Sequence, residues 1–82
     1  MQARVEIHLK KGVTDPEGVN VLKALKLLGF SNVSSVQSIK VFELRLSGLT
    51  ASRARAAVDE MCKKLLANPV IHDYRVEVRT GR

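Results

Sequence analysis

Few residues in this sequence could act as a nucleophile, a base or a metal ligand: it has one cysteine and two histidines. A catalytic nucleophile needs a base beside it and a group that orients the base. Cys62 falls on the apolar stripe of an expected helix, where a buried, inert thiol is the simpler interpretation. His8 falls on the polar face of an expected strand and His72 close to a loop, so we interpret both as surface or strand-edge residues. No nucleophile–base pair emerges.

Metal and phosphate sites are also missing from the sequence pattern. The two histidines are far apart, and no His or Cys pair has the spacing of metal ligands. Gly12 and Gly18 lack the spacing and the following Lys-Ser/Thr of a P-loop. Three glutamates take outward strand positions among basic residues, where cross-strand ion pairs are expected: Glu6, Glu43 and Glu77. The sequence therefore predicts a protein that works by binding, with no catalytic, cofactor-binding or metal-binding residue of its own.

The size of the chain indicates partners. Its 82 residues make one domain, predicted at residues 1–79 with a frayed tail at 80–82. Folds below roughly 70–80 residues usually depend on disulfides, a metal or oligomerisation. A single cysteine excludes an intrachain disulfide, and no metal site is found. Oligomerisation or a complex is the route that remains.

The net charge of +6 raises the question of nucleic acid. The basic residues are scattered. Phe42 and Tyr74 fall among the alternate, apolar residues of their strands and are therefore expected on the buried face, which argues against a nucleic-acid face with exposed aromatics. A small basic nucleic-acid-binding module of ferredoxin-like fold is the alternative hypothesis. A small-molecule sensor is a third hypothesis, although no convergent polar pocket is visible. Without an apolar run of about 20 residues or a signal-peptide pattern, we expect a soluble, cytoplasmic protein with no membrane contact.

The first half of the chain reads as a strand followed by a helix. Residues 4–10 alternate apolar and polar, which predicts a half-buried strand. A helix is predicted at residues 16–28, with Asp15 as N-cap and Gly29 as the residue that ends it. Its core-facing stripe is expected to contain Val21, Leu25 and Leu28. Val19 and Leu27 fall outside that stripe, as ordinary exposed aliphatics or as a second, intersubunit face.

The second half reads as strand, helix and strand. Residues 30–46 have the alternating pattern of a β-strand, but near Ile39 the apolar residues shift from one set of alternate positions to the other. We therefore predict either two strands with a tight turn near Ser38 or one strand with a bulge. A helix is predicted from a Thr50 cap to about Ala67, with one apolar stripe: Ala54, Val58, Met61 and Leu65. Two i,i+4 ion pairs are expected on its outer face: Asp59–Lys63 and Glu60–Lys64. A final strand is expected around residues 74–78.

This order predicts an α+β fold, a βαββαβ ferredoxin-like split βαβ in which a sheet carries two helices on one face. Four segments in register also resemble one known family: LKKGVTDPEG (9–18), ALKLLGF (24–30), VFELRL (41–46) and LLANPVIHDYRVEV (65–78). They are similar to the PurS subunit of phosphoribosylformylglycinamidine (FGAM) synthase, and the similarity covers nearly the whole chain.

The resemblance implies a small non-catalytic subunit that forms a homodimer or homotetramer. It would dock the synthetase (PurL-type) and glutaminase (PurQ-type) subunits and assist ammonia transfer between them. That complex makes formylglycinamidine ribonucleotide from formylglycinamide ribonucleotide, glutamine and ATP in purine biosynthesis. ATP and Mg²⁺ would be bound by the large subunit, and this chain would bind no cofactor.

Candidate partner-binding residues follow from the matching loops and their neighbours: Lys10, Lys11, Asp15, Pro16, Gly18, Lys40, Asn68, Pro69, Asp73 and Tyr74. Helix start, helix stop and turn formation are competing explanations for Asp15, both prolines and Asn68. Two departures from the family pattern stand out. Ile39 replaces a glycine and cannot easily take a positive φ, and His72 replaces an acidic residue.

Overall fold

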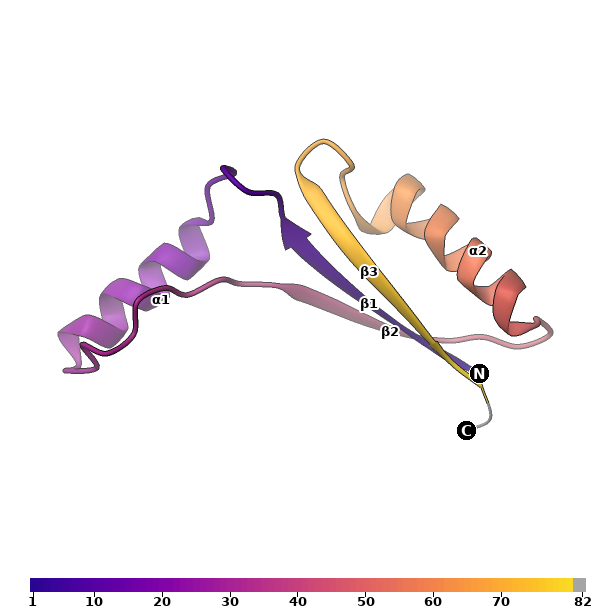
Figure 1. The fold of residues 1–82 in the computed structure, drawn as a ribbon, viewed down its shortest axis with the longest axis horizontal. Helices are drawn as coiled ribbons and strands as arrows, with labels where there is room; N and C mark the ends of the chain where they lie inside the picture. The colour runs from indigo at the N-terminus through magenta and orange to yellow at the C-terminus, as the bar shows by residue number, and fades with distance from the viewer. Residues whose placement is uncertain (81–82) are drawn as a thin grey trace.

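The computed structural model describes residues 1–80 of the chain, so of the tail expected at residues 80–82 only Thr80 falls within it. Three strands and two helices alternate along the chain (Figure 1). Their bounds are β1 Gln2–Leu9, α1 Pro16–Leu27, β2 Lys40–Arg45, α2 Ala51–Met61 and β3 His72–Arg79, with a π-helical turn at Cys62–Leu66 directly after α2.

The strands form one antiparallel sheet in the order β2-β1-β3. Val5 lies between Phe42 of β2 and Val76 of β3, so these three side chains share a face. That face is apolar, and the opposite face carries the charged residues expected from the alternation. The central strand β1 is also the most buried, since Ala3, Val5 and Ile7 are the least exposed residues of the sheet.

Helix α2 covers the apolar face of the sheet. Ala54, Val58 and Cys62 recur every four residues and are completely buried against it. Tyr74 of β3 donates its hydroxyl hydrogen to Asp59 Oδ1 and so ties the helix to the sheet. The Thr50 cap is confirmed, because its hydroxyl accepts from Arg53 N at 3.2 Å. Both expected helix ion pairs are present, at 3.1 Å for Asp59–Lys63 and 3.2 Å for Glu60–Lys64.

The π-helical turn changes which residues of the second helix are buried. Ala67 N donates to Cys62 O, five residues back, at 2.9 Å. The widened turn rotates the residues within it relative to an α-helix, so Leu65 is 82% exposed and Ala67 is buried. The expectation that Leu65 continues the buried stripe is therefore wrong, and Met61 is also 37% exposed.

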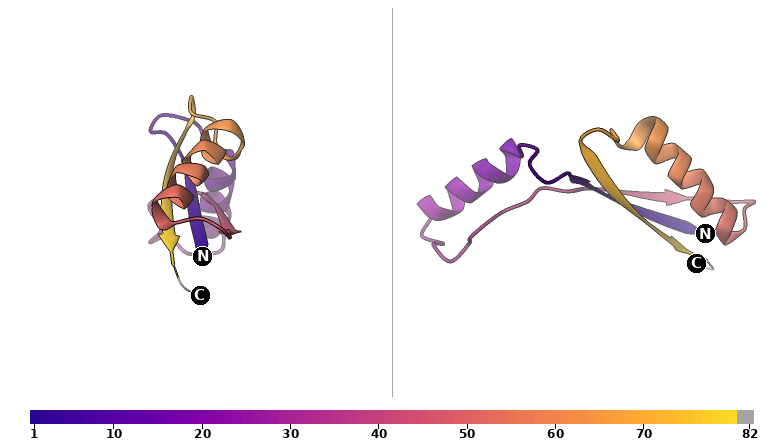
Figure 2. Two further views of the ribbon diagram at one scale, coloured as in Figure 1. Left: turned by 90° about the vertical axis from the view of Figure 1, so that its right-hand side faces the viewer. Right: turned by 45° about the horizontal axis from the view of Figure 1, so that its top comes forward.

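Helix α1 projects beyond the sheet and runs beside residues 33–39 (Figure 1). The radius of gyration is 16.2 Å, whereas a compact domain of this length would have about 12 Å. Figure 2 shows the same elongated shape from two further directions. The expectation that Val21 and Leu28 face a core is wrong in the single chain, since they are 43% and 72% exposed.

The predicted α+β class is confirmed, and the order of elements is consistent with a ferredoxin-like fold. The sheet of the described residues has three strands, because residues 33–39 run extended into β2 without joining the ladder. The predicted tight turn near Ser38 is thus absent, and so is one continuous strand over residues 30–46, because β2 begins only at Lys40. Ile39, where the family has glycine, cannot easily take the positive φ of such a turn. Only one of the two helices covers the sheet of its own chain.

Asp15 holds the base of α1 against this extended segment. Its carboxylate accepts hydrogen bonds from Gly18 N at 3.0 Å, Ser38 N at 2.8 Å and Ser38 Oγ at 2.9 Å. These hydrogen bonds lower the pKa of the Asp15 carboxyl, the bond from the Ser38 backbone most of all. We call this arrangement of Asp15, Gly18 and Ser38 the Asp15 clasp. It confirms Asp15 as the N-cap of α1 and fixes the direction in which α1 leaves the sheet.

Gly18→Ala should destabilise the protein. A Cβ at residue 18 would lie 2.5 Å from both Asp15 Oδ2 and the Val36 carbonyl oxygen. The Val36 carbonyl oxygen can move aside only if the backbone shifts. Urea unfolding at fixed protein concentration should therefore give a free energy of unfolding about 1–3 kcal/mol lower than that of wild type. Asn20→Ala, at an exposed position of the same helix, should stay within about 0.5 kcal/mol. Equal stability of Gly18→Ala and wild type would contradict the clasp.

Asp15→Asn should make stability less dependent on pH. Because the folded-state pKa of Asp15 lies below its ordinary value of 3.8, its stabilisation is complete above 3.8 and is lost as pH falls through the lowered pKa. An asparagine has one oxygen and presents a donor where Ser38 N also donates. The variant should therefore unfold at lower urea than wild type at neutral pH, and the difference should shrink in acid. A difference that does not vary with pH would argue against the charged clasp.

Candidate partner-binding surfaces

Most of the residues expected to bind partners lie around one end of the sheet. The two loops that carry them are joined by a hydrogen bond from Lys10 N to Ile71 O at 2.8 Å. A surface hollow of about 260 Å³ lies at this end. Apolar and polar side chains line it together: Ile7, Leu9, Glu17, Ser38, Ile39, Lys40, Leu66 and His72. The structure thus brings Lys10, Lys40 and the loop after the second helix toward one region.

The turn between the second helix and β3 is organised by Asn68. Its carbonyl accepts from Ile71 N at 3.0 Å and His72 N at 2.8 Å, and its side chain accepts from Val70 N at 3.0 Å. Asn68 N donates to His72 Nδ1 at 2.9 Å. Asn68 therefore builds the turn, and His72 accepts a hydrogen bond within it. Pro69 and Val70 stand exposed at its tip.

The remaining candidates divide between surface and interior. Lys11, Pro16 and Asp73 are exposed, and Asp73 lies opposite His8 on the charged face of the sheet. The Lys40 ammonium lies 5.9 Å from the centroid of the Phe42 ring. Tyr74 instead faces α2. Its hydrogen bond to Asp59, together with partial burial, raises the pKa of Tyr74 to about 12. Tyr74 is engaged inside the subunit, whereas its role in partner binding stays a prediction.

Exposed apolar residues form a further surface feature, which is not among the candidate residues taken from the matching loops. One set lies at the far end of α1: Leu27 (89% exposed), Leu28 (72%) and Phe30 (57%). A second set surrounds the turn after α2: Leu65 (82%) and Val70 (78%). The position of Leu27 outside the helical stripe was the available signal for the first set. The exposure of Leu65 depends on the π-turn, which has no sequence signature.

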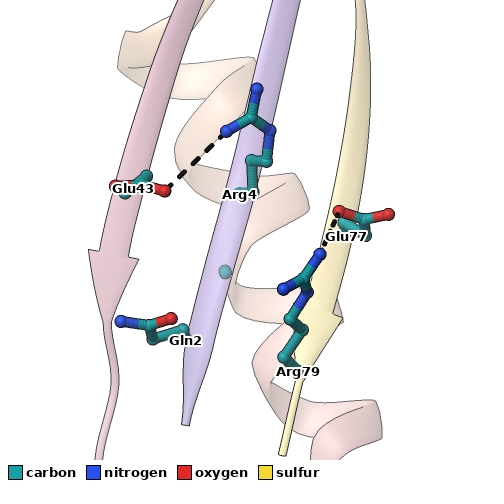
Figure 3. Close-up of a pocket in the computed structure, with 6 residues that line it drawn as sticks. Gln2, Arg4, Glu43, Glu77 and Arg79 are labelled. Carbon is teal, nitrogen blue, oxygen red and sulfur yellow. Dashed lines mark ion pairs between the residues drawn. The ribbon is translucent and has the colours of Figure 1, made fainter.

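The charged face of the sheet is left uncovered in the single chain. Figure 3 shows Arg4 reaching Glu43 on β2 at 3.8 Å and Arg79 reaching Glu77 at 3.9 Å. Arg4 also lies 3.5 Å from Glu6, and a shallow hollow of about 80 Å³ lies among these side chains. Of the cross-strand ion pairs expected for the three glutamates, the described residues form only that of Glu43 with Arg4 of β1. Glu6 and Glu77 pair instead with basic residues of their own strands. At these exposed positions the ion pairs orient side chains more than they stabilise the fold.

The chemistry available at these surfaces is polar and apolar contact. Cys62 is completely buried, and burial, with the charge of nearby Asp59, raises the pKa of its thiol, which disfavours the thiolate. Residues 1–80 contain no group of three His, Cys, Asp or Glu side chains that could hold a metal ion. Over the same residues, no helix has the length and hydropathy to cross a membrane.

Solved structures of PurS proteins have a similar shape. A crystal structure of PurS from Methanocaldococcus jannaschii matches with a TM-score of 0.90 at 47% identity, over 99% of this chain and 98% of that one. A Bacillus subtilis PurS structure matches with a TM-score of 0.85 at 40% identity, over 95% and 96% of the two chains. A chain from the structure of PurLQS from Thermotoga maritima shares the fold, with a TM-score of 0.84 at 24% identity over 93% of each chain.

Sequence comparisons agree with the structural ones. The phosphoribosylformylglycinamidine synthase subunit PurS of M. jannaschii is 51% identical over 77 residues, which cover 94% of this chain and 93% of the relative. The corresponding B. subtilis subunit is 40% identical, over 94% of this chain and 90% of the relative. The family model PurS, described as phosphoribosylformylglycinamidine (FGAM) synthase, matches residues 2–80. The chain belongs to the PurS family of FGAM synthase subunits.

Proposed function

We propose that this chain is the non-catalytic subunit that docks the synthetase and glutaminase subunits of FGAM synthase and assists ammonia transfer between them. The observation that carries the proposal is family membership over residues 2–80. The T. maritima structure named PurLQS, which contains a chain of the same fold, supports the pairing with both partners. ATP and Mg²⁺ are bound by the large partner subunit in this proposal, and the complex works in the cytoplasm.

The surfaces of the subunit suit a docking role. Exposed leucines and a phenylalanine at the end of α1, and Leu65 and Val70 at the turn after α2, supply apolar anchors. The Lys10 and Asn68 loops lie side by side and supply polar contacts that fix orientation. Because the two apolar sets lie on different elements of a molecule 50 Å long, one subunit can contact more than one partner.

The working form of the subunit in this proposal is a homodimer or homotetramer. A single chain leaves Val21 and Leu28 of α1 exposed, and it leaves the side chains of Phe42 and Leu44 only half-buried. Ten large apolar side chains of the described residues are exposed by more than a third. A chain of 82 residues cannot cover that surface with its own second layer.

Omitting the subunit from a reconstituted complex should abolish amidation with glutamine. Purified synthetase and glutaminase subunits would be assayed for formylglycinamidine ribonucleotide with this chain present or absent. With glutamine, product formation should fall to background without the chain, because ammonia is then not passed between the subunits. With ammonium salts, the synthetase should depend on the chain much less.

A matched pair of variants tests the docking surface. Leu65→Glu and Val70→Glu place charges on the exposed apolar set and should lower glutamine-dependent activity while leaving the fold intact, checked by circular dichroism. Glu60→Gln, on the exposed face of α2, serves as the control. Glutamine-dependent activity that does not change when the chain is omitted would contradict the proposed role.

A further inference from the structure

One histidine side chain closes the turn that carries part of the proposed docking surface. The turn, residues 68–72, lies at the end of the sheet opposite to the N-terminus (Figure 1), and we call it the Asn68 turn. Its two end residues are bonded twice. His72 N donates to Asn68 O at 2.8 Å, and Asn68 N donates to His72 Nδ1 at 2.9 Å. The second hydrogen bond depends on the charge of the imidazole ring.

This contact defines the protonation state of His72 in the closed turn. A ring nitrogen that accepts a backbone N–H carries no proton, so the proton of the neutral ring is on Nε2. In a charged imidazole both nitrogens are donors. Nδ1–H would then face Asn68 N–H, two donors without an acceptor between them. The closed turn is therefore compatible with the neutral ring only.

The Asn68 turn is anchored on both sides of its tip. Ala67, directly before the turn, is buried in the core, and Ile71 O accepts from Lys10 N at 2.8 Å. Between these anchors, the hydrogen bonds that the described residues make within the turn all involve Asn68. Val70 at the tip is 78% exposed. Losing the contact with the ring therefore loosens the residue on which the position of the tip depends.

The surroundings of the ring carry charges of both signs. His72 lies opposite Leu9 of β1 and lines the hollow of about 260 Å³ together with Glu17 and Lys40, one carboxylate and one ammonium group. Other titratable side chains nearby lie on the opposite face, in the adjoining loop, or in contacts of their own: His8 and Asp73 on the opposite face, Lys10 in the loop, Lys63 and Lys64 with Asp59 and Glu60, and Tyr74 with Asp59.

Histidine is the side chain that changes charge between pH 5 and 8. Carboxylates and ammonium groups ordinarily keep their charge over this range. The sequence has two histidines. His8 lies on the charged face near Glu6, at 3.6 Å. His72 is the histidine whose ring accepts a hydrogen bond from the backbone of the turn.

We propose that His72 is a pH-dependent switch on the Asn68 turn, which the neutral ring holds closed and protonation of the ring opens. Acid thereby loosens Pro69 and Val70 at the exposed tip. The consequence for the synthetase and glutaminase subunits rests on the proposed function, because that proposal places Val70 in the docking surface. The switch itself is a property of the single chain.

NMR spectroscopy and amide exchange on the purified chain test the switch. At pH 7.5, correlations between ring protons and ring nitrogens should show His72 with a proton on Nε2 and none on Nδ1. The Asn68 amide should be protected at this pH. Its protection factor should fall about five- to thirtyfold by pH 5, because a hydrogen bond is lost and two donors face each other. The Val5 amide, in the central strand, should keep its protection factor.

Three variants separate the acceptor from the ring. His72→Asp is the matched variant, because aspartate Oδ1 lies two bonds from Cβ, as Nδ1 does, and accepts over the whole range. Its Asn68 amide should stay protected from pH 7.5 to pH 5. His72→Phe keeps a ring without an acceptor, so its Asn68 amide should be unprotected at both values. His8→Gln, which removes the other histidine, should respond to pH as wild type does.

A proton on Nδ1 at pH 7.5, or equal protection of the Asn68 amide in wild type at the two pH values, would overturn the switch. A pH response of the same size in His72→Asp would also overturn it. These measurements use the chain alone. Their failure would leave the synthetase role standing, and a failed amidation assay would leave the switch standing.

Discussion

The three hydrogen bonds accepted by the Asp15 carboxylate decide the shape of the subunit. They join the first turn of α1 to Ser38 and hold the helix beside the extended segment of residues 33–39 (Figure 1). Gly18 allows this close approach because no side chain fits between Asp15 and the Val36 carbonyl. The consequence is an arm, residues 16–39, that is ordered but carries an uncovered apolar face. A chain built in this way needs a partner to bury that face.

The elements themselves could be predicted because their signals are local. Asp15 followed by Pro16 marked the start of α1, Thr50 the start of the second helix, and strand alternation gave the faces of β1 and β3. The placement of α1 could not be predicted, because the same amphipathic pattern serves packing within one chain or between two. The change of apolar parity at Ile39 was a real signal. It marks the point where the extended segment of residues 33–39, which lies outside the ladder, becomes strand β2.

The candidate site was predictable in location and less so in role. The matching loops do meet at one end of the sheet, through Lys10 and Ile71. Several of their residues, however, are occupied within the subunit: Asn68 builds a turn, and Tyr74 bonds to α2. Conversely, Leu65 is exposed because of the π-helical turn, which the spacing of apolar residues does not predict. Whether a side chain bonds within the subunit or stays free for a partner depends on three-dimensional packing, which the spacing of residues in the sequence does not predict.

The most direct test of the account is residue-resolved amide hydrogen exchange on the purified wild-type chain and on Asp15→Asn. Because Ser38 N donates to the Asp15 carboxylate, the Ser38 amide should be protected in wild type and should exchange much faster in the variant. Phe42 and Leu44, which pair with β1, should stay protected in both proteins. Equal exchange of the Ser38 amide in the two proteins would contradict the account.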